Sequence, residues 1–276
     1  MKKLLLLSVA ALLAACGSKT SGPASNNSEP AAAATAAATP AAAAAKTNAG
    51  NAAQETANTE DSPGDASLER AATVPAAAKL PAGKWEAGKN YIPIVPAQST
   101  SAEPGQVEVI EFMWLGCPHC ADLQPTLEAW VSKKPAYIKF VQEHVMWGPA
   151  HRQHAKLLYT LQALNRSDLV GKAFEQIHQR NNSLLSSKGD EAETMAIQMA
   201  FAKSNGISEA DFKREYNGFG VNTRLQRSEE LNRRYRIESV PTIIINGKYN
   251  TDVSKAGDKE KLLQLINDLA AAEKGR

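Results

Sequence analysis

The chain has few cysteines, few aromatic residues and almost no net charge, and these shortages narrow what it can be. Three cysteines in 276 residues are too few for a zinc site built from two Cys-x-x-Cys pairs. The 31 basic and 29 acidic side chains give a formal net charge of +2, which gives no reason to expect nucleic acid or an acidic substrate. Aromatic residues make up 6%, partly because a long alanine-rich tract dilutes them. The length suits one or two domains.

Residues 1–15 are typical of a secretory leader. Lys2 and Lys3 precede an apolar stretch, Leu4 to Ala15, which is too short to span a bilayer as a stable helix. Loss of this leader would also remove the small excess of positive charge. The sequence therefore predicts that the chain is exported.

The leader ends in a motif that resembles the lipobox of bacterial lipoproteins. The motif is Leu13-Ala14-Ala15-Cys16, with Gly17 and Ser18 after it. In that family the cysteine is lipidated and becomes the first mature residue, so the resemblance implies a lipid anchor on Cys16. The alternative is an ordinary cleavage site with a chance cysteine. No acidic residue follows Cys16 to argue for retention in the inner membrane, so the leaflet stays open.

Residues 16–83 are predicted to be a disordered tether between the anchor and a folded domain. They are mainly alanine and small polar residues, and residues 31–45 are almost all alanine. Such side chains bury too little surface to form a core. A separate helical domain is the alternative, against which Pro40, Pro63 and the lack of larger apolar residues count. The expected role of the tether is reach.

The folded part is organised around two cysteines separated by two residues, in the motif Cys117-Pro118-His119-Cys120. An apolar run, Val107 to Leu115, leads into the motif, and a segment compatible with a helix, Ala121 to Lys133, follows it. Strand, Cys-x-x-Cys and helix in this order are the layout of a thiol–disulfide redox site.

The expected helix start gives Cys117 its chemistry. A helix that begins at Pro118 leaves unpaired backbone N–H groups and a partial positive charge at its first turn. The pKa of the Cys117 thiol should therefore fall. Proline is well tolerated in a first helical turn, and a protonated His119 would add positive charge.

Half of a zinc site is the other interpretation of the cysteine pair. Further ligands would have to come from histidines, and His151 and His154 lie three residues apart, so they could share a helix face. The strand-to-helix context favours redox chemistry, and no resident metal is expected. A tethered metal-binding module that uses Cys117, Cys120 and a histidine stays open as a rival function.

Five strands are expected from the apolar pattern: Lys89–Val95, Gln106–Leu115, Ala136–Val141, Thr242–Ile245 and Lys248–Val253. Pro93 confines the first to an edge, while the second is buried and central, with the third parallel to it. Asn246-Gly247 predicts a hairpin between the last two. Glu111 is the exception within the central strand. It either faces solvent or is a buried carboxylate beneath the cysteines, where it would couple to their protonation.

The region between the third and fourth strands lacks strand signals and is predicted to be helical. The expected helices are His151–Leu164, Asp168–Gln179, Glu191–Lys203, one that begins after Ser208, and Val221–Tyr235. Ser167 and Asp190 are expected to cap the second and third of these, and Asn205-Gly206 to end the third. A last amphipathic helix, Asp258–Ala271, closes the chain.

From about residue 88 onward the chain resembles the DsbA family of thiol–disulfide oxidoreductases. The matching motifs are Glu111-Phe112, Cys117-Pro118-His119-Cys120, and Val240-Pro241 followed by a strand and Asn246-Gly247-Lys248-Tyr249. The resemblance implies an α/β class, a thioredoxin fold with an inserted all-helical domain. Its expected boundaries are 84–149 and 237–276 for the thioredoxin domain and 150–236 for the insertion. Trp114-Leu115 departs from the Phe-rich approach of some members, which leaves the substrate groove in doubt.

The resemblance also implies roles for the residues of the motif. Cys117 would be the exposed cysteine that substrate thiolates attack, and Cys120 would be its buried partner. His119, with the helix that starts at Pro118, would stabilise the Cys117 thiolate. The reduced form would then be stabilised, which makes the disulfide easy to donate.

Two further positions match the family outside the motif. Glu111 matches a buried acidic residue beneath the site. Val240-Pro241 matches a loop with a cis proline, which would place the backbone of Val240 beside the sulfurs, where it could pair with an extended substrate peptide. The redox-active disulfide takes the place of a cofactor.

The function that the resemblance implies is periplasmic donation of the Cys117–Cys120 disulfide to folding exported proteins. A membrane protein of the DsbB type would restore the disulfide, and Cys16 would hold the protein at a lipid membrane. A monomer is expected, because the sequence has no evident additional dimerisation domain. A disulfide reductase or isomerase is the alternative within the same class of enzyme.

Overall fold

The computed structural model describes residues 80–274, so the leader, Cys16 and most of the tether lie outside the described residues. In chain order the elements are β1 (Ile92–Pro93), β2 (Val107–Met113), α2 (Pro118–Val131), β3 (Ile138–His144), α3 (Pro149–Ala163), η1 (Ser167–Leu169), α4 (Val170–His178), α5 (Glu191–Ser204), α6 (Glu209–Tyr216), α7 (Phe219–Arg234), β4 (Thr242–Ile245), β5 (Tyr249–Thr251), α8 (Val253–Ala256) and α9 (Lys259–Glu273). Within this range no helix is long and apolar enough to cross a bilayer.

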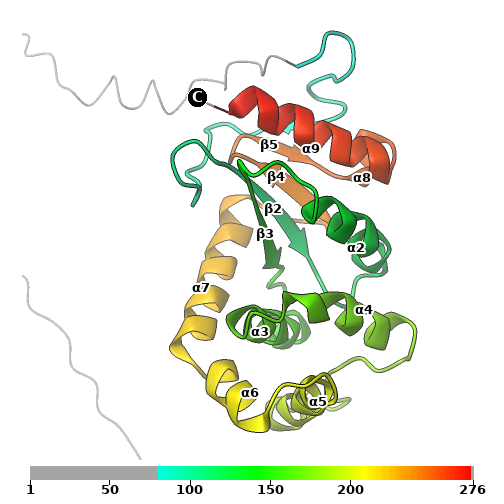
Figure 1. The fold of residues 1–276 in the computed structure, drawn as a ribbon, viewed down its shortest axis with the longest axis vertical. Coiled ribbons are helices and arrows are strands. Elements are labelled where there is room, and N and C mark those ends of the chain that lie inside the picture. Colours follow the sequence, from blue (N-terminus) through cyan, green and yellow to red (C-terminus); the bar gives the residue numbers. More distant parts are fainter. Residues whose placement is uncertain (1–79, 275–276) are drawn as a thin grey trace, which may run out of the picture. The chain divides into compact units, whose positions relative to one another are not determined.

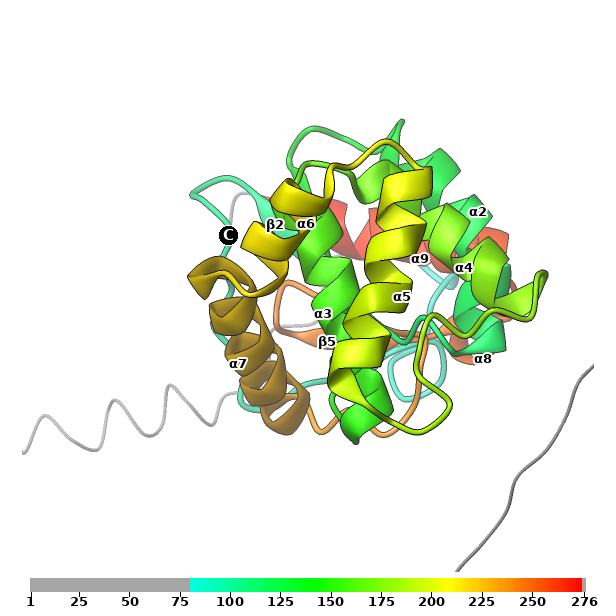
Figure 2. The same cartoon turned by 90° about the horizontal axis from the view of Figure 1, so that it is seen from below.

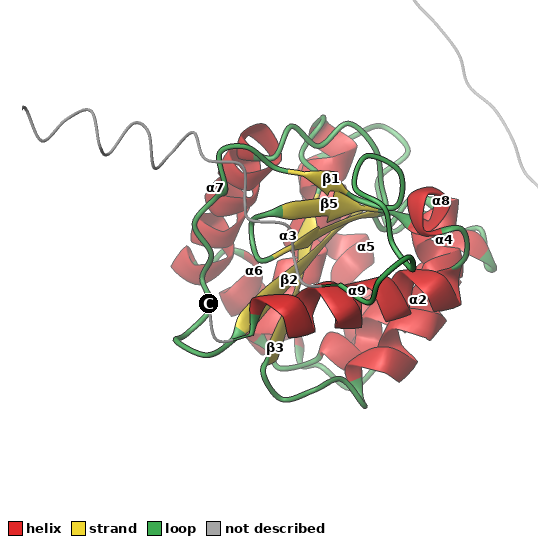
Figure 3. Ribbon diagram, turned by 90° about the horizontal axis from the view of Figure 1, so that it is seen from above, coloured by secondary structure: helices red, strands yellow, loops and turns green. Residues whose placement is uncertain are grey.

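The five strands form one mixed sheet in the order β1-β5-β4-β2-β3 (Figure 3). As predicted, β2 is buried along its whole length and pairs in parallel with β3, and β1 lies at an edge. Strand β4 runs antiparallel to both β2 and β5. The hairpin between β4 and β5 turns at Asn246 and Gly247, which both have positive φ, of 51° and 65°. A Cβ at Gly247 would also lie 2.1 Å from the Gln98 carbonyl oxygen, so this position requires glycine.

Helices cover both faces of the sheet, because its strands carry apolar side chains on both sides. On one face α2 and α9 pack against β2 and β4, through residues such as Leu127 and Leu265 against Val109. On the other face Tyr235 at the end of α7 packs against Phe112 of β2. Figure 1 shows α9 and α2 on the side of the sheet away from α7.

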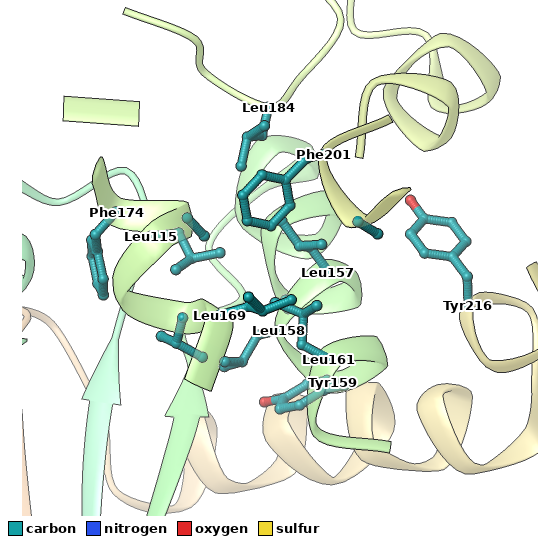
Figure 4. Packing of buried hydrophobic residues seen from close by; sticks show 14 of the residues in the cluster. Leu115, Leu157, Leu158, Tyr159, Leu161, Leu169, Phe174, Leu184, Phe201 and Tyr216 are labelled. Atoms are coloured by element: carbon teal, nitrogen blue, oxygen red, sulfur yellow. The ribbon is translucent and has the colours of Figure 1, made fainter. Parts of the chain in front are cut away.

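Helices α3 to α7 fall between β3 and β4 in the chain and form a helical layer with its own apolar core (Figures 1 and 2). That core contains buried residues from all five helices and also Leu115, Cys117 and Cys120 of the segment after β2. The close view in Figure 4 shows Leu115 among side chains of this layer. The predicted boundaries of the insertion remain predictions.

Most expected elements are confirmed, with shifts at their ends. Asp190 and Ser208 cap α5 and α6, each accepting a backbone N–H three residues on, and Asn205 ends α5 as expected. The expected cap at Ser167 is wrong: this residue begins the short helix η1, no side chain caps η1, and α4 starts only at Val170. Strand β3 runs three residues beyond the predicted end at Val141.

Candidate active site

Cys117 is the residue that precedes the first turn of α2. Its backbone is extended, with φ of −86° and ψ of 121°, and Pro118 is the first residue of the helix. No side-chain oxygen caps this helix. The backbone N–H of Cys117 donates to the Trp114 carbonyl at 2.9 Å, which closes a tight turn between β2 and α2. The N–H groups of the first helical turn have no partner within the helix, so they can donate to the Cys117 sulfur.

Hydrogen bonds to the sulfur lower the pKa of Cys117 to about 6. The largest cause is a hydrogen bond from the Cys120 thiol; the backbone N–H groups of Cys120 and His119 and the charge of His119 add to it, while burial acts in the opposite direction. The sequence predicted the helix start and His119 as causes, and missed the thiol of Cys120. Because two residues separate the cysteines, the first turn of the helix brings the Cys120 thiol next to the Cys117 sulfur.

The pKa of Cys120, in contrast to that of Cys117, is raised. Its causes are the same hydrogen bond to Cys117, then complete burial, then the negative charge of Glu111. Both cysteines are free, so the structure represents the dithiol form. The two thiols therefore differ strongly: Cys117 favours the thiolate, and Cys120 holds its proton.

The expected exposure of Cys117 is wrong in degree. The residue is only 6% exposed, while Cys120 is fully buried. Pro118 and His119 between them are exposed. Cys117 packs into the edge of the helical core, so an attacking thiolate can reach only a small part of its sulfur.

Glu111 lies on β2 and is completely buried. Gln142 Nε2 donates to its Oε2 at 2.8 Å, and its Oε1 has no hydrogen-bond partner. Burial is the main cause that raises the pKa of Glu111 to about 7; the Gln142 donor opposes it and the charge of Cys117 adds to it. The solvent-facing alternative is therefore wrong, and the carboxyl group is coupled electrostatically to both cysteines.

The loop before β4 reaches the same sulfur from a distant part of the sequence. The Val240–Pro241 peptide bond is cis, and the Cys117 sulfur lies 3.6 Å from the Val240 carbonyl oxygen. The Val95–Pro96 bond is also cis, which the sequence did not indicate.

A groove of about 250 Å³ lies between α2, the Val240–Pro241 loop and the start of α9. His119, Pro241 and Leu123 line it together with charged residues, among them Asp122 and Lys259, which form an ion pair at 2.7 Å. The sequence did not identify this pair, because it joins residues 137 positions apart.

Among residues 80–274, no group of three or more His, Cys, Asp or Glu side chains is placed to hold a metal ion. His151 and His154 do share α3, but they lie against the aromatic ring of Trp114.

Comparison with known proteins matches residues 102–268 to a family model described as thioredoxin. The chain is 35% identical over 189 residues to the thiol:disulfide interchange protein DsbA of Pseudomonas syringae pv. tomato, which covers 68% of this chain and 85% of the relative. The chain belongs to the DsbA family. The DsbA of Burkholderia cepacia is 38% identical over 165 residues, 59% of this chain and 74% of that protein.

The crystal structure of Pseudomonas aeruginosa DsbA has the same fold, with a TM-score of 0.62 and 30% identity over 70% of this chain and 96% of that one. The fold is therefore a thioredoxin fold with an inserted helical domain. As a member of the DsbA family the chain is a thiol:disulfide oxidoreductase with dithiol oxidase activity. Membership implies a redox-active disulfide, protein substrates with cysteines, and the periplasm as the place of action.

Proposed function

We propose that the Cys117–Cys120 disulfide is donated to cysteines of exported proteins in the periplasm. The observation that carries the proposal is the opposite behaviour of the two thiols. The pKa of Cys117 is lowered to about 6 and that of Cys120 is raised. A stabilised thiolate at Cys117 stabilises the reduced enzyme, so the disulfide is readily given up.

The reaction takes two exchange steps. A substrate thiolate attacks the Cys117 sulfur, the bond between the two enzyme sulfurs breaks, and its electron pair leaves on Cys120, which takes up a proton. A second substrate thiolate then attacks the substrate sulfur of the mixed disulfide. Cys117 leaves as a thiolate. The substrate gains a disulfide, and the enzyme gains the two electrons.

The neighbouring residues have supporting roles in this proposal. The N–H groups at the start of α2, with Pro118 fixing the first turn, and the charge of His119 stabilise the leaving thiolate of Cys117. Glu111, whose pKa of about 7 lies near neutrality, exchanges a proton with its surroundings as the charge on the sulfurs changes.

The loop of Val240 and Pro241 supplies backbone beside the reacting sulfur. Its position, with the Val240 carbonyl oxygen 3.6 Å from the Cys117 sulfur, supports pairing with an extended substrate segment. Both charge signs in the groove, from Asp122 and Lys259, favour substrates with polar side chains around the cysteine.

The test uses oxidised protein and a reduced, unfolded substrate with two cysteines. Wild type should form one substrate disulfide per enzyme disulfide consumed, and Cys117→Ser should form none. Cys120→Ser also lacks the enzyme disulfide and should form none; when it is incubated instead with the oxidised substrate, its Cys117 thiolate should attack the substrate disulfide, displace one substrate thiolate and be trapped as a mixed disulfide. Donation by Cys117→Ser at the wild-type rate would refute the proposal.

Two partners complete the proposed cycle. A membrane oxidant of the DsbB type re-forms the Cys117–Cys120 disulfide, and a lipidated Cys16 holds the protein, as a monomer, at the periplasmic side of a membrane. Cys16 lies outside the described residues. Expression of the full chain in a bacterial host tests the anchor: the wild-type protein should sediment with membranes, and Cys16→Ser should stay in the soluble periplasmic fraction. An equal distribution of the two would contradict it.

A further inference from the structure

The turn that leads into Cys117 is held by three histidines that the disulfide chemistry itself does not use. This turn, Trp114 to Cys117, exposes three polar groups to its surroundings: the indole N–H of Trp114 and the backbone N–H and carbonyl of Leu115. Each of the three groups is bound by a different histidine.

The three histidines come from three different elements. The Leu115 N–H donates to His144 Nε2, at the end of β3, at 3.2 Å. The Leu115 carbonyl accepts a hydrogen bond from His178 Nε2, at the end of α4, at 2.8 Å. The Trp114 indole donates to His154 Nδ1, on α3, at 3.0 Å. Helices α3 and α4 belong to the helical layer, so that layer contacts the turn directly.

The partners fix the protonation of two of these rings. His144 Nδ1 lies 2.8 Å from the Val145 carbonyl, and His154 Nε2 lies 2.8 Å from the Ser183 carbonyl. Each ring therefore donates to a carbonyl with one nitrogen and accepts an N–H with the other, which only the neutral ring can do. Burial is the main cause that lowers the pKa of both rings, that of His154 to about 4, so both stay neutral near pH 7. The neutral rings of His144 and His154 therefore remain hydrogen-bond acceptors for the turn near pH 7.

Packing holds the same turn from two further sides. The side chain of Leu115 is fully buried in the core of the helical layer, beside side chains such as Phe174 and Leu169 (Figure 4). The ring of Trp114 lies over Gly116, where a Cβ would come within 2.5 Å of it. The position of the Trp114 ring therefore requires glycine at position 116, directly before Cys117.

We propose that His144, His154 and His178 are positioning residues for disulfide exchange, which hold the turn so that the Cys117 sulfur stays opposite its hydrogen-bond donors. The inference rests on the proposed function of Cys117. Through these contacts the helical layer contributes to the redox chemistry as well as covering it. A turn that can move would let the sulfur leave the Cys120 thiol and the N–H groups of α2. The thiolate would then lose stabilisation.

His178 offers the sharpest test, because it is half-buried and its ring has a separate packing contact with Phe174, with centroids 6.0 Å apart. His178→Phe keeps a stacked ring and loses the donor to the Leu115 carbonyl. His178→Gln loses the ring and keeps a donor at the same position. Gln179→Phe, at the exposed next residue, is the control for an added ring at the end of α4.

The measurements are the pH dependence of Cys117 alkylation by iodoacetamide, the equilibrium with glutathione, and the thermal unfolding midpoint. His178→Phe should raise the Cys117 pKa by about half a unit to one unit and lower the equilibrium constant for reduction by glutathione about three- to tenfold. His178→Gln should stay near wild type in both, and Gln179→Phe should not change them. At the Trp114 contact, His154→Leu and His154→Asn should reproduce the difference, since asparagine keeps an acceptor.

Equal changes in the Phe and Gln variants, or a lower unfolding midpoint with an unchanged Cys117 pKa, would show that His178 only packs, and would overturn the proposal. Alkylation of Cys117 needs no protein substrate. A wild-type protein that fails to donate its disulfide would therefore refute the proposed function without affecting the comparison of the His178 variants.

Discussion

Two carboxyl groups, on the neighbouring parallel strands β2 and β3, are buried almost equally but are treated differently by their surroundings. Glu111 is 0% and Glu143 is 1% exposed. Because Glu111 pairs with Gln142 in the register, and Glu143 with Phe112, the two side chains point to opposite faces of the sheet. Burial is the main cause that raises the pKa of both.

The difference lies in their partners. Glu143 accepts the Tyr159 hydroxyl at 2.9 Å and lies 3.9 Å from Arg224 and 3.8 Å from Arg227 of α7. Glu111 has one neutral donor, Gln142, and one oxygen without a partner. Glu143 joins the sheet to the helical layer, whereas Glu111 is left short of partners next to the cysteines. Of these two carboxyl groups, the incompletely satisfied one is therefore the one at the redox site, and the fully satisfied one is at the structural contact.

The largest effect should come from removing the satisfied carboxyl group. Glu143→Leu leaves the Tyr159 hydroxyl without its acceptor, takes the counter-charge from Arg224 and leaves Arg227 with Glu108 alone, at 4.0 Å. We expect the free energy of unfolding to fall by about 3 kcal/mol, mainly because the buried Tyr159 hydroxyl loses its acceptor, since solvent reaches both arginines, which are 37% and 41% exposed. Urea unfolding of the oxidised protein at pH 7 measures it. A loss no larger than that of a surface substitution would remove the distinction between the two carboxyl groups.

Glu111→Gln should have the opposite sign, and only at higher pH. The folded-state pKa of Glu111, about 7, lies above the ordinary value of 4.5. Below pH 4.5 the carboxyl group is protonated in both states, and as the pH rises through 7 the folded state loses relative stability. Glutamine cannot ionise. The variant should therefore match wild type near pH 4 and be about 2–3 kcal/mol more stable at pH 8.

This experiment belongs on the oxidised protein, in which the two sulfurs do not titrate. Urea unfolding at pH 4, 6 and 8 gives the curve. A difference between Glu111→Gln and wild type that does not change with pH would mean that folding does not change the pKa of Glu111, contrary to its raised value.

A smaller effect should follow from loss of a single partner of Glu143. Tyr159→Phe removes the hydrogen bond to Glu143 and the acceptor for the His144 backbone N–H, which lies 3.0 Å from the hydroxyl oxygen. We expect a loss of about 1–2 kcal/mol, since buried groups are left unsatisfied. The double variant with Glu143→Leu should lose less than the sum of the single changes. Simple additivity would show that the two residues are energetically independent.

The smallest effect is expected at an exposed carboxylate. Glu209 pairs with Lys203 at 2.8 Å, with side chains 44% and 67% exposed. Lys203→Met should not change stability measurably, with or without added salt, because solvent screens such pairs. A clear loss of stability would mean that burial is not what separates these carboxylates.

The same comparison shows what the sequence could and could not predict. The position of Cys117 at the start of α2 follows from local order, so it could be predicted. The sequence predicts an end of β3 at Val141, three residues too early, because Gln142, Glu143 and His144 are polar and break the alternating pattern. They are strand residues because distant groups satisfy them. Gln142 donates to Glu111 and Gln124, Tyr159 contacts both Glu143 and His144, and the arginines of α7 lie near Glu143. No local pattern reveals those partners.

The site shows the same division. The sequence predicted the lowered pKa of Cys117 and two of its causes, the helix start and His119. The hydrogen bond from Cys120 was missed, because it depends on the geometry of the folded turn. The place of Val240 came only from resemblance to a family. The histidines around Leu115 gave no signal, since His144, His154 and His178 lie far apart in the sequence and meet only once the helices have folded.

The contact between Cys117 and Val240 has a consequence for the order in which the active site is made during synthesis. The residues that meet at Cys117 are separated by 123 positions, from the cysteine to Val240. Synthesis starts at the N-terminus, so both thiols exist as part of an unfinished chain before α7 and the last two strands are made. A nascent chain is therefore at first an unfolded protein with two cysteines, like the enzyme's own substrates. It becomes a catalyst only when about its last fifth has been synthesised and has folded against the rest.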